Sequence, residues 1–220
     1  MSIRVFLTST GISTERLKKD LFKFLPTTPS NLNALFITTA SNPFMEDKSW
    51  LIDEINSLYK LQFKNFFMRD IASATKAVVL QEINNSDVLI FGGGEEFYLL
   101  DKLREHFADN ELKELFSKKL YIGISAGSMI LAPILSVEVS HKIYKESLDR
   151  KDSVSGLGLI NFYIIPHLYA KWDNLAITPD AINSIKNAVK LPIYAIDDNT
   201  ALIVQDNKIS VVGDKRFYKV

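Results

Sequence analysis

The chain has 220 residues, 47% of them hydrophobic, and its 26 basic residues balance its 26 acidic ones. This size suits one domain with a full hydrophobic core, and the neutral charge gives no sign of a nucleic-acid or anionic-membrane partner. The absence of cysteine excludes a disulfide framework and a cysteine nucleophile. No apolar run approaches the roughly 20 residues that span a bilayer, and Arg4 interrupts the first run, so we expect a cytoplasmic protein without a signal peptide.

Short apolar runs alternate with amphipathic stretches along the whole chain, which predicts an α/β fold over residues 1–220 as a single domain. The predicted strands are Arg4–Leu7, Ala34–Thr38, Phe63–Met68, Val88–Phe91, Leu120–Ile124, Tyr163–Ile165, Ile193–Ile196, Ala201–Val204 and Lys208–Val212. The predicted helices are Ser13–Phe24, Asp47–Tyr59, Ser73–Asn84, Phe97–His106, Asn110–Phe116, Met129–Leu135 and Asp180–Val189. Because helices separate the first five strands, we expect a mostly parallel sheet with helices on both faces. The last two strands read as a C-terminal β-hairpin.

Polar or glycine-rich segments follow four of the predicted strands. Residues 38–43 follow the second strand, Gly92-Gly93-Gly94 the fourth, Ser125 the fifth and Pro166-His167 the sixth. In a parallel sheet the carboxyl ends of the strands gather at one edge, where ligands bind. We therefore expect these segments to form one site.

The segment Gly123-Ile124-Ser125-Ala126-Gly127 has the Gly-x-Ser-x-Gly form of a nucleophile elbow. The preceding strand delivers Ser125 into a sharp turn, and the N–H of Ala126 is left free to face an oxyanion. A glycine turn such as 92–94 lets backbone amides approach a reacting carbonyl, so we expect a second donor there and choose Gly94 over its neighbours.

Of the three histidines, His167 is the predicted general base because it closes an apolar run at a strand end. His106 and His141 lie in polar segments and are expected at the surface. An acid should orient the imidazole, and Asp197 and Asp198 follow another strand end. The other acidic residues that could orient the imidazole are Glu138, Glu146, Asp149, Asp152 and Asp173.

The order of these groups, serine then histidine then acid, disfavours an ordinary α/β-hydrolase, in which the histidine comes last. The sequence instead resembles the peptidase E family of serine peptidases, the aspartyl-dipeptidase-like enzymes related to cyanophycinase. The matching segments are 91–97, Gly123 to Ser128, Gly156-Leu157-Gly158-Leu159 with Ile165-Pro166-His167, and Ala195 to Leu202, in family order over nearly the whole chain.

This resemblance implies a class I glutamine-amidotransferase-like fold and a Ser125-His167-Asp198 triad, with no metal and no organic cofactor. Asp198 falls where the family usually has glutamate. Glu95 and Glu96 fall where the family usually has asparagine and threonine, so that Glu95 takes the position of a substrate-binding residue. A carboxylate there would repel an acidic substrate residue, which argues against carrying over the aspartyl-dipeptidase specificity.

The expected function is hydrolysis of short peptides near the N-terminus by Ser125, His167 and Asp198, with the amides of Gly94 and Ala126 holding the oxyanion. The alternatives are an esterase or amidase with the same triad and a non-peptide substrate, and a catalytically silent binding or regulatory relative. The expected partner is a short peptide substrate, with no nucleic acid and no membrane. The oligomeric state is left open, with a homodimer as one option.

Overall fold

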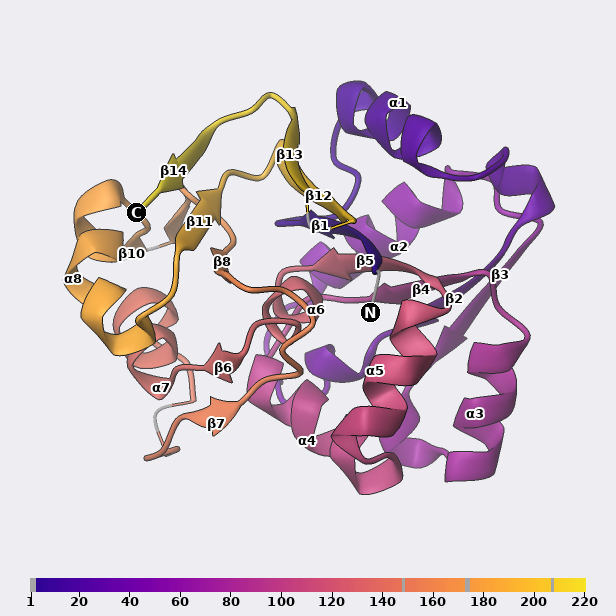
Figure 1. Ribbon diagram of the computed structural model, residues 1–220, viewed down its shortest axis with the longest axis horizontal. Helices are drawn as coiled ribbons and strands as arrows, with labels where there is room; N and C mark the ends of the chain where they lie inside the picture. Colours follow the sequence, from indigo (N-terminus) through magenta and orange to yellow (C-terminus); the bar gives the residue numbers. More distant parts are fainter. Residues whose placement is uncertain (1–2, 148, 173–174, 207) are drawn as a thin grey trace.

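The computed structural model describes residues 3–147, 149–172, 175–206 and 208–220. A seven-stranded sheet in the order β13-β12-β1-β5-β4-β2-β3 runs through the molecule (Figure 1). Its strands are β1 (Arg4–Thr8), β2 (Asn33–Ile37), β3 (Asn65–Arg69), β4 (Val88–Phe91), β5 (Leu120–Ile124), β12 (Thr200–Gln205) and β13 (Lys208–Gly213). The first five are parallel, while β12 and β13 add an antiparallel hairpin beside β1. Both the parallel sheet and the hairpin agree with the sequence prediction.

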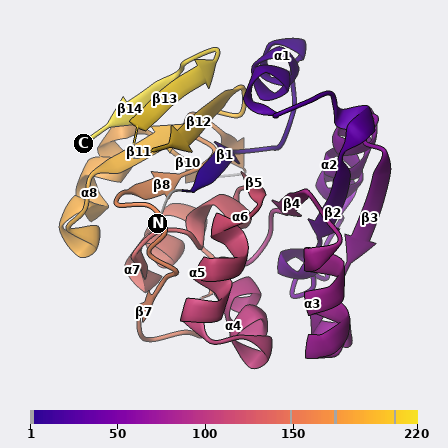
Figure 2. The same ribbon diagram turned by 45° about the vertical axis from the view of Figure 1, so that its right-hand side comes forward.

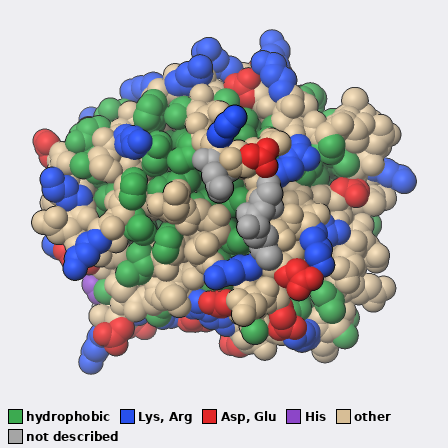
Figure 3. Space-filling model, viewed as in Figure 1, with side chains coloured by type: hydrophobic (Ala, Val, Ile, Leu, Met, Phe, Trp, Pro, Cys, Tyr) green, Lys and Arg blue, Asp and Glu red, His purple; other side chains and the backbone are tan. Residues whose placement is uncertain are grey.

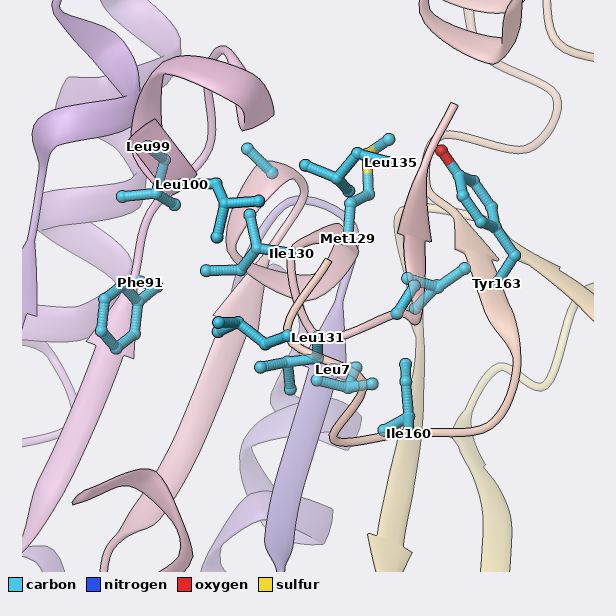
Figure 4. Packing of buried hydrophobic residues seen from close by; sticks show 14 of the residues in the cluster. Leu7, Phe91, Leu99, Leu100, Met129, Ile130, Leu131, Leu135, Ile160 and Tyr163 are labelled. Carbon is cyan, nitrogen blue, oxygen red and sulfur yellow. The ribbon is translucent and has the colours of Figure 1, made fainter. Parts of the chain in front are cut away.

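Helices cover both faces of this sheet, as predicted. Helices α1 (Glu15–Phe24) and α2 (Ser49–Tyr59) pack on one face, and α3 (Lys76–Asn84), α4 (Glu96–His106) and α5 (Asp109–Ser117) pack on the other (Figure 1). The alternation of side chains along each strand produces two cores, so that Phe6 faces α1 while Leu7 faces the opposite cluster. Figure 4 shows part of the larger cluster, in which Leu7, Phe91 and Leu99 pack together with residues of the segment after β5.

The sixth and seventh predicted strands form a separate sheet rather than continuing the first. β8 (Tyr163–Ile165) pairs in parallel with β11 (Ile193–Ile196), which pairs antiparallel with β14 (Phe217–Lys219). Figure 2 shows this smaller sheet, with α8 (Pro179–Val189) beside it, next to the edge of the main sheet that carries β12 and β13. The two sheets share one hydrophobic cluster, which holds β8 and β11 in a fixed position against the main sheet.

The predicted helix Met129–Leu135 is wrong. Helix α6 covers only Ala126–Met129, and Ile134–Leu135 is a strand, β6, paired with β7 (Val154–Ser155). Pro133 explains the difference, because it has no N–H to donate and disfavours helical geometry in the residue before it. The remaining short elements are α7 (Val137–Val139), a π-helical turn (Ser140–Tyr144), β9 (Lys171–Trp172), β10 (Leu175–Ala176) and 3₁₀ turns at Pro29–Asn31, Thr39–Ser41 and Ile71–Ser73.

The surface carries both signs of charge. On the face shown in Figure 3, basic and acidic side chains are mixed, with apolar side chains exposed between them. This distribution agrees with the balanced charge of the sequence. Within the described residues, no helix combines the length and apolar character needed to cross a membrane.

Candidate active site

Ser125 lies in the sharp turn between β5 and α6 that the motif predicts. Its backbone angles, φ 46° and ψ −110°, are far from those of a strand or a helix. The turn is held because the Ser125 N–H donates to the carbonyl of Thr8 (3.1 Å) and its own carbonyl accepts from Ser128 N (2.8 Å). A Cβ at Gly127 would lie 2.1 Å from the carbonyl oxygen of Phe91, so the last glycine of the motif is required for the close approach of β4. The half-buried Ser125 side chain lines a cavity.

His167 and Asp198 converge on Ser125 from the smaller sheet. The ring of His167 places Nε2 3.1 Å from Ser125 Oγ and Nδ1 2.9 Å from Asp198 Oδ1. Because a carboxylate only accepts, Nδ1 carries the proton and Nε2 presents a lone pair to the serine hydroxyl. Burial by itself raises the pKa of Asp198, but its hydrogen bonds with His167 and Ser9 hold the pKa below the usual value of an aspartate. The structure therefore brings the three predicted residues together in one hydrogen-bonded series.

Ser9, at the carboxyl end of β1, is a fourth member of this group that the sequence analysis missed. Its hydroxyl donates to Asp198 Oδ1 (2.7 Å) and accepts from the backbone N–H of His167 (2.7 Å), and it also lies 3.1 Å from His167 Nδ1. The side chain is buried. The signal was present in the sequence, because Ser9 lies two residues after a predicted strand, as His167 and Asp198 do.

Asp197, the neighbour of Asp198, has a structural position instead. Its side chain accepts from the N–H of Asn199 (3.2 Å) and lies 3.6 Å from Arg216 Nε. The other acids do not replace Asp198 at the imidazole: Glu138 pairs with Lys142, Glu146 lines the cavity elsewhere, Asp149 and Asp152 are exposed, and Asp173 lies outside the described residues.

The two remaining histidines are half-buried rather than solvated. His106 Nε2 donates to the carbonyl of Ile71 (2.9 Å), and His141 Nε2 donates to the carbonyl of Ser147 (2.7 Å). Neither is among the residues that line the cavity around Ser125. Both histidines satisfy loop carbonyls, and a polar sequence context did not reveal this.

The backbone amides of the glycine turn have different partners. The N–H of Gly92 donates to Ile37 O, that of Gly93 to the carboxylate of Glu54 (3.3 and 3.4 Å), and that of Glu95 to Ala40 O. Among the described residues, no partner is found for the N–H of Gly94, which lines the cavity with Ser125. Ala126 begins α6, so its N–H has no carbonyl partner within the helix. These are the two amides that the sequence analysis selected.

Glu95 does not face the cavity as expected. It is the N-cap of α4, where its carboxylate accepts from Tyr98 N and also from the hydroxyl of Ser147. The next residue, Glu96, is buried and lines the cavity in its place. The cause is the start of the helix: a capping side chain folds back on the first turn, and the residue after it projects from the helix.

The cavity around Ser125 has a volume of about 950 Å³ and is rich in carboxylates. Glu54 on α2 is buried at its wall, next to Gly93, and burial raises its pKa to about 8. Apolar side chains of Phe44, Trp50 and Met129 also line the cavity. No sequence signal distinguished Glu54 from the other acids of its amphipathic helix.

A serine hydroxyl beside an oriented imidazole, with backbone amides nearby that have no hydrogen-bond partner among the described residues, can perform acyl transfer through a covalent intermediate. A group of histidine, aspartate and glutamate side chains that could hold a metal ion is not found in the described part of the chain. The fold and the site thus define an α/β protein equipped for serine-based hydrolysis.

Comparison with known proteins identifies the family. The model of peptidase family S51 matches residues 5–212. An uncharacterised peptidase of Pasteurella multocida is 26% identical over 201 residues, which cover 90% of this chain and 93% of the relative. A peptidase E of Shewanella amazonensis is 30% identical over 145 residues, covering 63% of this chain and 59% of the relative. The chain belongs to peptidase family S51 and is a peptidase.

Solved structures support the same fold. A candidate peptidase E from Listeria monocytogenes EGD-e superposes with a TM-score of 0.74 at 22% identity, covering 96% of this chain and 98% of that one. A peptidase from an acI-B1 Actinobacterium superposes with a TM-score of 0.65 at 20% identity, covering 97% and 88%. The resemblance to peptidase E stated from the sequence is confirmed.

Proposed function

We propose that this chain is a serine peptidase that hydrolyses short peptides near their N-terminus, with Ser125 as nucleophile, His167 as general base and Asp198 as the orienting acid. The observation that carries this proposal is the unbroken series from Ser125 Oγ to His167 Nε2 (3.1 Å) and from His167 Nδ1 to Asp198 Oδ1 (2.9 Å). Membership of peptidase family S51 supports peptide hydrolysis as the reaction, and the hydrogen-bonded series supports Ser125, His167 and Asp198 as the residues that perform it.

In this mechanism Ser125 Oγ attacks the scissile carbonyl carbon while His167 Nε2 takes the hydroxyl proton. The negative charge that develops on the carbonyl oxygen is held by the N–H groups of Gly94 and Ala126. His167 then gives its proton to the leaving amine, and water releases the acyl group by the same steps in reverse order. Asp198 keeps the imidazole in the correct tautomer and stabilises its cation.

The size of the cavity supports a small substrate. Its volume of about 950 Å³ falls in the range of sites for small ligands and leaves room for a few residues of peptide. The aromatic side chains of Phe44 and Trp50 offer an apolar wall beside the polar groups.

A serine-directed fluorophosphonate tests the nucleophile directly. We expect one label per chain, located on Ser125 by peptide mapping, no label in Ser125→Ala and strongly slowed labelling in His167→Ala. An unlabelled native protein would indicate a silent relative. Labelling together with hydrolysis of aryl esters, but of no di- or tripeptide, would indicate an esterase or amidase instead.

A further inference from the structure

Glu96 is a buried carboxylate that the proposed mechanism does not use. It is 1% exposed, lies at the start of α4 and lines the cavity that contains Ser125. The Ser140 side chain forms a hydrogen bond with the Glu96 carboxylate, but Glu96 Oε1 has no hydrogen-bond partner among the described residues. A buried acceptor without a donor is costly, so an oxygen in this position points to a group that arrives with the substrate.

Glu146 brings a second carboxylate to the same part of the cavity. It is half-buried, and Glu96 and Glu146 lie close enough for their charges to interact. Burial, with the nearby charges of Glu95 and Glu46, raises the pKa of Glu146 to about 7. Burial, with the charges of Glu95 and Glu146, raises the pKa of Glu96 to about 8. With this pKa Glu96 is mostly protonated near pH 7, and once ionised it is repelled by the charges of Glu95 and Glu146.

The ion pairs of the described residues leave these glutamates without a positively charged partner. In the described ranges of the chain, no lysine, arginine or histidine forms an ion pair with Glu46, Glu95, Glu96 or Glu146. The lysines that line the cavity, Lys18 in α1 and Lys60 just after α2, form no ion pair with these glutamates. The described carboxylates also do not form a group that could hold a metal ion.

We propose that Glu96 and Glu146 bind the cationic side chain of a lysine or arginine residue next to the scissile bond of the substrate. This inference rests on the proposed peptidase function and names its substrate class. An ammonium or guanidinium group would give Glu96 Oε1 the donor that it lacks and would favour the ionised form of Glu96 against the charges of its neighbours. A long, flexible side chain can reach a carboxylate at the cavity wall while the peptide backbone stays beside Ser125. The same charges disfavour an acidic residue at that place.

Matched dipeptides separate the side-chain charge from every other feature of the substrate. Lys-Leu and norleucine-Leu have the same α-ammonium group and nearly the same side-chain length, but only the first has a side-chain cation. Leu-Lys and Leu-norleucine make the same comparison after the scissile bond, and Asp-Leu carries the opposite charge. The measurements are kcat/KM for the native protein, Glu96→Gln, Glu146→Gln and the control Glu138→Gln, whose glutamate is paired with Lys142 outside the cavity.

We expect the lysine peptide of one pair to exceed its norleucine partner by about tenfold or more, with Asp-Leu the poorest substrate. This ratio should fall towards one in Glu96→Gln and in Glu146→Gln and stay unchanged in Glu138→Gln. Equal values within both pairs would overturn the proposal. So would an equal loss for lysine and norleucine peptides in both glutamine variants, because the carboxylates would then recognise the α-ammonium group.

Binding to Ser125→Ala, measured by calorimetry, tests the inference without hydrolysis. This protein should bind the preferred lysine peptide about tenfold more tightly than its norleucine partner, and adding Glu146→Gln should remove the difference. A failure of the native protein to hydrolyse any peptide would count against the proposed function alone. Equal binding of the lysine and norleucine peptides would count against the lysine site alone. Glu146 is half-buried, so its variant keeps the test valid if Glu96→Gln does not fold.

Discussion

Ser9 connects His167 and Asp198 without contacting Ser125. Its hydroxyl holds one carboxylate oxygen of Asp198 and the backbone N–H of His167, so its removal should loosen the imidazole rather than the substrate. We expect Ser9→Ala to lower kcat by about ten- to a hundredfold with little change in KM. Thr10→Ala is the matched control, because Thr10 donates to the backbone carbonyl of Asp198 and not to its carboxylate. An equal loss in both variants would show that Ser9 has only a general structural role.

The two neighbouring aspartates should separate activity from stability. Asp198→Ala should lose at least an order of magnitude more activity than Asp197→Ala, because only Asp198 contacts the imidazole. Asp197→Ala should lower the melting temperature more. The buried Asp197 carboxylate accepts a hydrogen bond from Asn199 N–H and pairs with Arg216, and the substitution removes both contacts. Steady-state kinetics and thermal unfolding of both variants check this pair of expectations, and a larger activity loss in Asp197→Ala would reverse the assignment.

At the level of single residues, the sequence predicted the serine, the histidine and the aspartate that the structure brings together. Each lies one or two residues after a predicted strand, and that position is visible in a sequence. Ser9 has the same position and could have been included. Glu54 could not, because its place beside Gly93 depends on how α2 packs against the sheet. Glu95 was expected at the cavity, but Glu96 lies there instead. The exact start of α4 decides which of the two side chains caps the helix and which projects from it.

The elbow between β5 and α6 depends on Gly127, where an added Cβ would lie 2.1 Å from a carbonyl oxygen of β4. Gly127→Ala should therefore push β4 and α6 apart, lower the stability by about 1–3 kcal/mol or more and displace Ser125 from His167. Gly158→Ala is the control: a Cβ there meets nothing closer than 3.9 Å, although its φ of 61° is strained for alanine. The control should lose some stability and keep its activity. Full activity in a folded Gly127→Ala protein would contradict this account of the elbow.

Among the elements, the parallel strands were the easiest to predict because each contains a short apolar run, and β4 and β5 are buried along their whole length. The edge strand β3 is largely exposed. The division into two sheets was not predictable from such runs, because the pairing of β8 with β11 joins segments that lie far apart in the sequence. Residues 129–135 were misassigned because an apolar run of this length suits a helix or a short strand equally well. Pro133 decided between them.

The stability of the whole molecule should fall as the pH rises, because the structure buries carboxyl groups. The pKa of Glu54 is raised by burial to about 8 from an ordinary value of 4.5. Between these two values the folded protein keeps a proton that the unfolded chain releases, so this contribution to the free energy of unfolding is complete below about pH 4.5 and is lost as the pH rises through 8. At about 1.4 kcal/mol per pKa unit, the loss is several kcal/mol at most.

Glu54→Gln removes this titration, so its melting temperature should rise relative to the native protein as the pH increases from 5 to 9. Ser57→Ala, one turn further along α2, is the control and should differ from the native protein by a constant amount at every pH. Parallel melting curves for Glu54→Gln and the native protein at all pH values would mean that Glu54 keeps an ordinary pKa in the folded state.

Digestion of a dipeptide and tripeptide library by the native protein and by Ser125→Ala, followed by mass spectrometry, tests the central claim most directly. If Ser125 is the nucleophile, the native protein cleaves short peptides near their N-terminus. The variant, equally folded by circular dichroism, should then be slower by about 10⁴-fold or more. His167→Ala should be similarly impaired, and the double variant hardly worse than either, because the two residues act as one unit. Cleavage by Ser125→Ala within tenfold of the native rate would contradict the account.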